Sequence, residues 1–180
     1  MHALKFLNET AALALEIDCD AVDELAKKIL ETEGRIYVIG LGGSYANAMH
    51  FAADLRRLCD VDAEAFTNMA ELTARANDDG FDTIFAIPSV SERDGLVVLS
   101  VGGGTEVVSI PIAKTVRSFP GWVGGIVGPG GGVTADIGTH VVKVPVEIEE
   151  RITPHTEAFQ AVIWHCIVSN PILQRNPTKW

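Results

Sequence analysis

Four ionisable side chains fall into two pairs whose spacing suits one face of a helix. His50 and Asp54 are four residues apart in a segment with a helical pattern, so their side chains meet. Glu157 and His165 are eight residues apart, a little over two turns, in a second predicted helix. Two imidazoles and two carboxylates are ligands that zinc or another divalent metal accepts. The pairs therefore form a metal site if the two helices face each other.

Each pair also has a simpler explanation. His50 and Asp54 suit an ion pair on the surface of a helix. His165, beside Trp164 and Cys166, suits a core histidine that is hydrogen-bonded to a carbonyl. Taken singly, each pair favours the simpler explanation, and only their convergence would indicate a metal.

Two glycine clusters follow predicted strands and offer a second kind of chemistry. Residues 40–44 read Gly-Leu-Gly-Gly-Ser where a strand turns into a helix, so backbone N–H groups and a hydroxyl can face an anion. Residues 100–105 read Ser-Val-Gly-Gly-Gly-Thr and repeat this chemistry. The first loop is not a Walker loop, and a turn that needs glycine only for its backbone shape is an equal alternative. The candidate phosphate-binding residues are Gly42, Gly43, Ser44, Ser100, Gly102, Gly103, Gly104, Thr105 and Ser109.

The charge of the chain limits the classes of partner. Its 180 residues include 14 basic and 24 acidic side chains, which gives a net charge of −10. Binding to the phosphate backbone of nucleic acid therefore has little electrostatic support, and a phosphate ligand must rely on backbone N–H groups. Arg56 and Arg57 either touch such a phosphate or are solvated or paired.

The cysteines and the hydropathy point to a cytoplasmic protein. Cys19, Cys59 and Cys166 are odd in number and scattered, which fits neither a disulfide framework nor a cysteine-rich zinc module. We expect reduced, buried thiols. No stretch of about 18 uninterrupted apolar residues predicts a membrane span.

Helical and strand patterns alternate along the chain. The predicted helices cover residues 10–32, with one break allowed, and residues 44–58, 69–76, 105–117 and 154–169; residues 81–87 form a helix or a loop. The predicted strands cover residues 35–40, 63–67, 96–101, 122–127 and 140–146, with a short turn at 134–137. This alternation implies an α/β fold whose parallel sheet is covered on both faces. Ligands in such folds bind beyond the carboxyl ends of the strands, where the strand order reverses.

One domain over residues 1–180 accounts for this length and for 47% hydrophobic residues. Residues 1–34 are expected to form a helical segment that contributes to an oligomer, and residues 35–180 the α/β core.

The run from Gly40 to Leu55, Gly-Leu-Gly-Gly-Ser-Tyr-Ala-Asn-Ala-Met-His-Phe-Ala-Ala-Asp-Leu, resembles the signature of the phosphoheptose isomerases of the sugar isomerase (SIS) superfamily. Residues 77–81, Asn-Asp-Asp-Gly-Phe, are similar to a second family segment, and residues 154–165, Pro-His-Thr-Glu-Ala-Phe-Gln-Ala-Val-Ile-Trp-His, occupy the place of the last helix. The resemblance implies a flavodoxin-like SIS domain with a five-stranded parallel sheet. It also implies a cytoplasmic homotetramer with active sites near subunit interfaces.

The resemblance assigns roles to the four ionisable residues. His50 matches a zinc-binding histidine, and Asp54 stands where the family has a glutamate that binds zinc and acts as a base. Glu157 stands where many members have a glutamine ligand, and His165 matches a ligand histidine that serves as the partner acid or base. The implied reaction interconverts sedoheptulose 7-phosphate and D-glycero-D-manno-heptose 7-phosphate through an enediol. The alternatives are a non-catalytic SIS module that binds a sugar phosphate or serves in assembly, and an isomerase of another phosphosugar.

Overall fold

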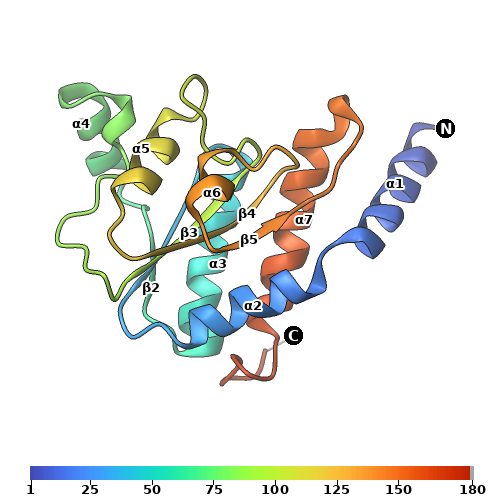
Figure 1. Ribbon diagram of the computed structural model, residues 1–180, viewed down its shortest axis with the longest axis horizontal. Coiled ribbons are helices and arrows are strands. Elements are labelled where there is room, and N and C mark those ends of the chain that lie inside the picture. Colours follow the sequence, from blue (N-terminus) through green and yellow to red (C-terminus); the bar gives the residue numbers. More distant parts are fainter. Residues whose placement is uncertain (179–180) are drawn as a thin grey trace.

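The computed structural model describes residues 1–178, which form a five-stranded sheet between two layers of helices (Figure 1). The strands are β1 (Ile36–Gly40), β2 (Ala63–Ala65), β3 (Gly95–Ser100), β4 (Trp122–Val127) and β5 (His140–Lys143). The helices are α1 (His2–Glu16), α2 (Cys19–Leu30), α3 (Gly43–Cys59), α4 (Met69–Asp78), α5 (Ile110–Ser118), α6 (Gly132–Ile137) and α7 (Ile152–Val168), with short 3₁₀ turns at Phe81–Thr83 and Glu149–Arg151. No helix in this part of the chain is long and apolar enough to span a bilayer.

Strand β1 shows why helices cover both faces of the sheet. All of its residues are buried, and successive side chains point to opposite faces. Ile36 and Val38 pack into a core with α2, α3 and α7. Tyr37 and Ile39 pack into a second core with α5 and α6. A strand that is apolar on both sides is typical of a buried parallel sheet.

The order of the strands places the two glycine clusters side by side. The order is β2-β1-β3-β4-β5, and all neighbours run parallel. Strands β1 and β3 are neighbours, with Gly40 opposite Leu99 in the register. The loops that follow them therefore lie at the same edge, where the strand order reverses. The predicted α/β class with a five-stranded parallel sheet is confirmed.

The N-terminal segment forms two helices. The first begins at His2, well before the predicted start at residue 10, and α1 angles away from the sheet (Figure 1). The break falls at Ile17, which is extended, and at Asp18, whose side chain accepts the N–H of Ala21 at 3.1 Å. This N-cap starts α2 in a new direction.

The predicted helix over residues 105–117 begins only at Ile110. Thr105 Oγ1 accepts the N–H of Val108, and Ser109 Oγ accepts the N–H of Thr105, each at 3.0 Å. Side chains that bond nearby backbone groups in this way compete with helix formation. Strand β5 is also shorter than the predicted strand over residues 140–146. It ends at Lys143, two residues before Pro145.

The expectation of buried thiols is wrong for two of the three cysteines. Cys59 is buried, whereas Cys19 and Cys166 are exposed. All three are free thiols, as the sequence predicts.

Candidate active site

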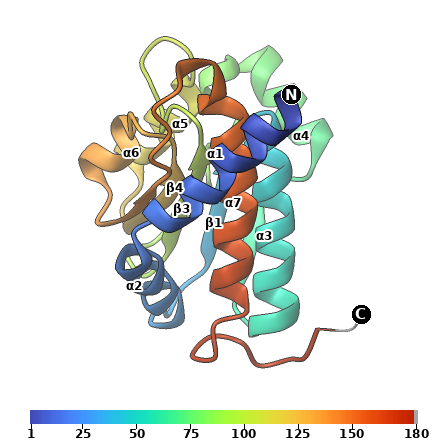
Figure 2. The same cartoon turned by 90° about the vertical axis from the view of Figure 1, so that its right-hand side faces the viewer.

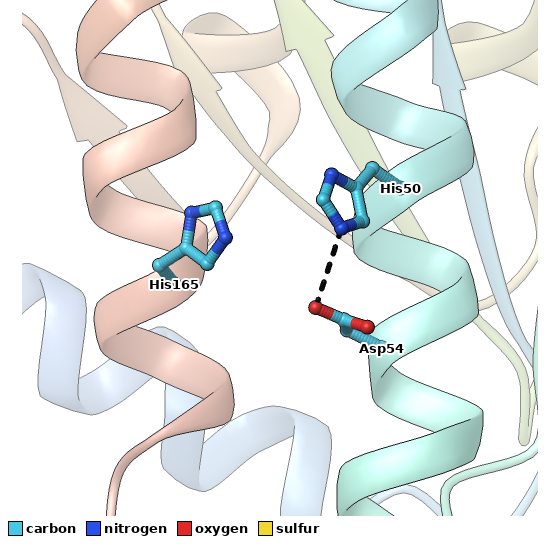
Figure 3. A group of neighbouring side chains, drawn as sticks. All are labelled: His50, Asp54 and His165. Atoms are coloured by element: carbon cyan, nitrogen blue, oxygen red, sulfur yellow. Dashed lines mark ion pairs between the residues drawn. The ribbon is translucent and has the colours of Figure 1, made fainter. Parts of the chain in front are cut away.

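His50, Asp54 and His165 converge between two neighbouring helices. Helices α3 and α7 lie side by side (Figure 2), and each contributes at least one of these side chains. One ligand atom from each residue lies within 4.8 Å of the other two (Figure 3). His50 Nε2 is 3.5 Å from Asp54 Oδ2, as the spacing of four residues along α3 predicts. We call these three residues the His-Asp-His cluster.

The orientation of His165 favours binding through its Nε2. Its Nδ1 lies 2.7 Å from the carbonyl oxygen of Ala161, one turn earlier in α7. An N–H at Nδ1 satisfies this carbonyl and leaves a lone pair on Nε2, which is how a backbone carbonyl commonly orients a ligand histidine. The carbonyl partner that the simpler sequence explanation requires is thus present. His165 is nevertheless exposed and is not a core residue.

Trp164 supports both imidazoles, a role that sequence reasoning missed. Its ring is almost fully buried and stacks on His165, and its centroid lies 4.5 Å from that of His50. Its Nε1 donates to Asn47 Oδ1 at 3.5 Å. The only signal in the sequence was its position next to His165, which gave no indication that it also reaches α3.

The donor set of the cluster fits a divalent metal. Two imidazole nitrogens and one carboxylate oxygen within reach of one ion match the three protein ligands of catalytic zinc sites. The side chain of Asp54 is 8% exposed, whereas that of His50 is 58% exposed. The carboxylate of the cluster is therefore buried, and the cluster is open to solvent on the side of His50. A substrate oxygen or water can approach from that side.

Glu157 does not join the cluster. It lies eight residues before His165, which is about 12 Å along α7. Its carboxylate lies instead over Gly43, where a Cβ would collide with it. Glu157 thus lies beside the start of α3, whereas His165 lies beside His50 and Asp54 further along that helix. The sequence-based grouping of four ligands around one ion is therefore reduced to three within the described chain.

The first glycine loop forms the amino end of α3. Gly42 has a φ of +61°, a left-handed conformation that favours glycine, and α3 begins at Gly43. Ser44 is buried, and its Oγ has no hydrogen-bond partner among residues 1–178. The Glu157 carboxylate lies at this positive end of the helix, which stabilises a negative charge. A phosphate bound by Gly42, Gly43 and Ser44 would thus lie beside a carboxylate.

Burial affects a phenol next to the same loop. Tyr45 lines an apolar cavity of about 240 Å³ together with Leu41, Leu72 and Phe85. Burial raises the pKa of Tyr45, and its hydroxyl donates to the carbonyl of Phe66. The phenol is therefore neutral and already bonded, so this side of the loop is apolar.

The hydroxyls of the second loop hold its shape. Ser100 Oγ accepts the N–H of Gly103 at 3.0 Å, and Thr105 and Ser109 make the bonds described above. Each hydroxyl retains its own O–H for a further acceptor. Gly103 and Gly104 have φ values of +67° and +84°, and a Cβ on Gly103 would collide with the carbonyl oxygen of Gly131. The simpler explanation, glycine for backbone shape and close packing, holds for Gly103 and Gly104, whereas Gly102 is exposed.

The two arginines have different partners. Arg57 Nη2 lies 3.0 Å from Asp54 Oδ1, so of the alternatives that the sequence left open, this side chain is paired. Arg56 Nη1 donates to the carbonyl of Ala63.

Comparison with known proteins identifies the family. No family model matches the chain. Phosphoheptose isomerase 1 of Campylobacter jejuni is 31% identical over 140 residues, which cover 73% of this chain and 75% of that protein. The chain belongs to the phosphoheptose isomerase family.

Two further members of the family support this assignment. The phosphoheptose isomerase of Mycobacterium tuberculosis is 36% identical over 127 residues, which cover 66% of this chain but only 64% of that relative. The structure of a phosphoheptose isomerase from Neisseria gonorrhoeae superimposes with a TM-score of 0.75 at 26% identity, over 92% of this chain and 97% of that one. The parallel sheet with its helices is therefore the fold of this family.

Proposed function

We propose that this family member is a metal-assisted aldose-ketose isomerase that interconverts sedoheptulose 7-phosphate and D-glycero-D-manno-heptose 7-phosphate. The observation that carries the proposal is the convergence of His50, Asp54 and His165 from two helices. His50, Asp54 and His165 would hold zinc or another divalent metal. When bound, the metal would polarise the sugar carbonyl and stabilise the charge that develops in the enediol.

Asp54 and His165 are the proposed catalytic pair. Isomerisation moves one proton between C1 and C2 and a second between O1 and O2, so it needs a base at the carbons and an acid-base partner at the oxygens. Asp54 Oδ2 lies 3.5 Å from His50 Nε2, and one ring nitrogen of His165 lies within 4.8 Å of a ligand atom of each of these two residues. We assign Asp54 as the base and His165, in the steps in which its Nε2 is not bound to the metal, as the group that moves the proton between O1 and O2.

The distance between the cluster and the glycine loops suits an open-chain sugar phosphate. Gly43 and His50 are seven residues apart on α3, which corresponds to about 10 Å along the helix. An extended seven-carbon sugar with its reacting carbons at the cluster places its phosphate near the loops. Ser44, Ser100, Gly102, Thr105 and Ser109 remain the proposed phosphate-binding residues, with Gly42, Gly43, Gly103 and Gly104 shaping the cradle.

We further propose a homotetramer that works in the cytoplasm. Leu4, Leu7 and Leu15 on α1 are more than half exposed, as is Val162 on α7, so both helices present apolar surface to a neighbouring subunit. The free thiols of the described chain suit a reducing compartment.

The test is turnover of sedoheptulose 7-phosphate by the zinc-loaded protein, followed through the aldose product. His165→Ala is expected to lose the activity, whereas His140→Ala, which removes an imidazole from β5 outside the cluster, is expected to keep it. Absence of turnover in the wild type would favour a non-catalytic sugar-phosphate module. Undiminished turnover in His165→Ala would refute the assigned role of this residue.

A further inference from the structure

Arg57, near the end of α3, holds one oxygen of the Asp54 carboxylate. Its Nη2 lies 3.0 Å from Oδ1 and its Nε lies 3.4 Å from the same atom. The other oxygen, Oδ2, lies 3.5 Å from His50 Nε2. The two oxygens of this carboxylate therefore have different partners, an arginine on one side and the His-Asp-His cluster on the other.

The burial of Asp54 makes this contact consequential. Its side chain is 8% exposed, whereas that of Arg57 is 59% exposed. A buried carboxylate that loses a charged partner is left uncompensated, and it is free to rotate and exchange its two oxygens. The exposed arginine also reaches Asp54 with two nitrogens, a contact that the point charge of a lysine does not reproduce.

The C-terminal segment fixes the backbone that carries Arg57. The Nδ2 of Asn176 donates to the carbonyl of Arg57 at 3.1 Å. The N–H groups of Arg175 and Asn176 both donate to the carbonyl of Leu58, at 2.8 and 2.9 Å. These bonds connect the last turn of α3 to the chain that follows α7, so the backbone of Arg57 is held in place.

We propose that Arg57 is a positioning residue that presents Asp54 Oδ2 to the metal and keeps Oδ1 out of the coordination sphere. This inference rests on the proposed metal-assisted function. Groups that hydrogen-bond a metal ligand from behind set its orientation, and their loss typically costs about 10- to 100-fold in metal affinity or activity. Asp54 is the buried ligand of the cluster, so its orientation decides whether both helices reach the same ion.

The experiment compares zinc affinity, measured by competition with a chromophoric chelator, in the wild type and in Arg57→Gln, Arg57→Lys and Arg56→Gln. Arg56 is the matched control, because it is the adjacent arginine and donates at 2.6 Å to the carbonyl of Ala63 rather than to Asp54. We expect Arg57→Gln to bind zinc about 10- to 100-fold more weakly. Arg57→Lys should lose affinity in the same direction but less, and Arg56→Gln should match the wild type.

The visible absorption spectrum of the Co²⁺-loaded protein gives a second readout that a loss of general stability does not move. Arg57→Gln is expected to change the band intensities, because the carboxylate ligand is no longer held, whereas Arg56→Gln should keep the wild-type spectrum. If Arg57→Gln does not fold, Arg57→Lys decides, and wild-type affinity and spectrum in that variant would overturn the proposal.

A zinc affinity of Arg57→Gln that equals or exceeds that of Arg56→Gln would also overturn the proposal. Arg57 would then have no effect on metal binding or would compete with the metal for Asp54. A wild type that binds no zinc would refute the metal centre together with this inference. Tight zinc binding without turnover would refute only the isomerase reaction.

Discussion

The Nδ2 of Asn47 on α3 donates a hydrogen bond of 2.9 Å to the backbone carbonyl of Glu157 on α7. The same group donates to Gln160 Oε1 at 3.1 Å. These bonds fix how far α7 is shifted along α3. The register matters because His50 and Asp54 lie on one helix and His165 on the other, and a shift of one turn would separate them.

Asn47→Ala is expected to lower the free energy of unfolding by about 1 to 3 kcal/mol, because it leaves the buried Gln160 Oε1 without its donor. It should also weaken zinc binding, since the two helices would lose their register. Urea denaturation and the chelator competition measure the two effects. Asn77→Ala, on an exposed part of α4, is the control, and equal stability of the two variants would contradict this role for Asn47.

In the second glycine loop, alanine substitutions at two neighbouring positions should change the stability of the protein by very different amounts. Gly103→Ala meets a left-handed backbone, which alone costs about 1 to 2 kcal/mol, and a collision with the carbonyl of Gly131. Gly102→Ala meets only Thr105 Cγ2 at 3.7 Å and Ser109 Oγ at 3.9 Å. Thermal unfolding should show a large loss for the first variant and almost none for the second. Similar melting temperatures would show that Gly131 does not constrain this loop.

Asp94 gives the protein an acid-sensitive contact far from the cluster. Burial works against its ionisation, but hydrogen bonds from the N–H groups of Ser91 and Arg35, together with the Ser91 hydroxyl and the charge of Arg35, outweigh burial and hold the pKa of Asp94 below its ordinary value. A carboxyl with a lowered pKa contributes stability that is complete above the unfolded-state pKa and is lost as the pH falls through the folded-state pKa.

Asp94→Asn should therefore be less stable than the wild type at neutral pH, and the gap should close in the acid range below about pH 4. Urea denaturation across that range measures the gap, with the exposed Asp136→Asn as the control for a lost charge. A gap that stays constant down to the lowest pH would rule out the linkage.

The three thiols should differ in reactivity. Burial raises the pKa of Cys59 to about 11, so almost no thiolate forms near neutral pH. Burial also raises the pKa of Cys166, although part of this residue is exposed. Iodoacetamide should label Cys19 first, Cys166 more slowly and Cys59 only after unfolding. Mass spectrometry follows the order, and rapid labelling of Cys59 in the folded protein would contradict the structure.

The strands and the later helices could be predicted because their apolar pattern reflects burial on the sheet. Residues 122–127 form the predicted strand without change, and the predicted helix over 154–169 differs from α7 by two residues at its start and one at its end. The loop over residues 105–109 could not be predicted, because the side-chain hydroxyls of Thr105 and Ser109 accept hydrogen bonds from backbone N–H groups that would otherwise bond within a helix. Hydropathy does not report that competition.

The site was predictable only where its geometry is local. The spacing of His50 and Asp54 within one helix fixes their contact, whereas the position of Glu157 depends on the axial length of α7 and on its register against α3. The Arg57 contact was left undecided, because a surface arginine three residues from an acid is common and carries no signal of its own. Trp164 reaches His50 only through the packing of two helices, which no spacing within one helix encodes.

Metal titration of four proteins tests the central claim most directly: wild type, His50→Ala, His165→Ala and Glu157→Ala, each freed of metal and titrated with zinc. The structure predicts one strong site per chain in the wild type, its loss in both histidine variants, and its retention in Glu157→Ala, whose carboxylate lies over Gly43 rather than in the cluster. Loss of the site in Glu157→Ala with retention in His165→Ala would contradict the centre formed by His50, Asp54 and His165.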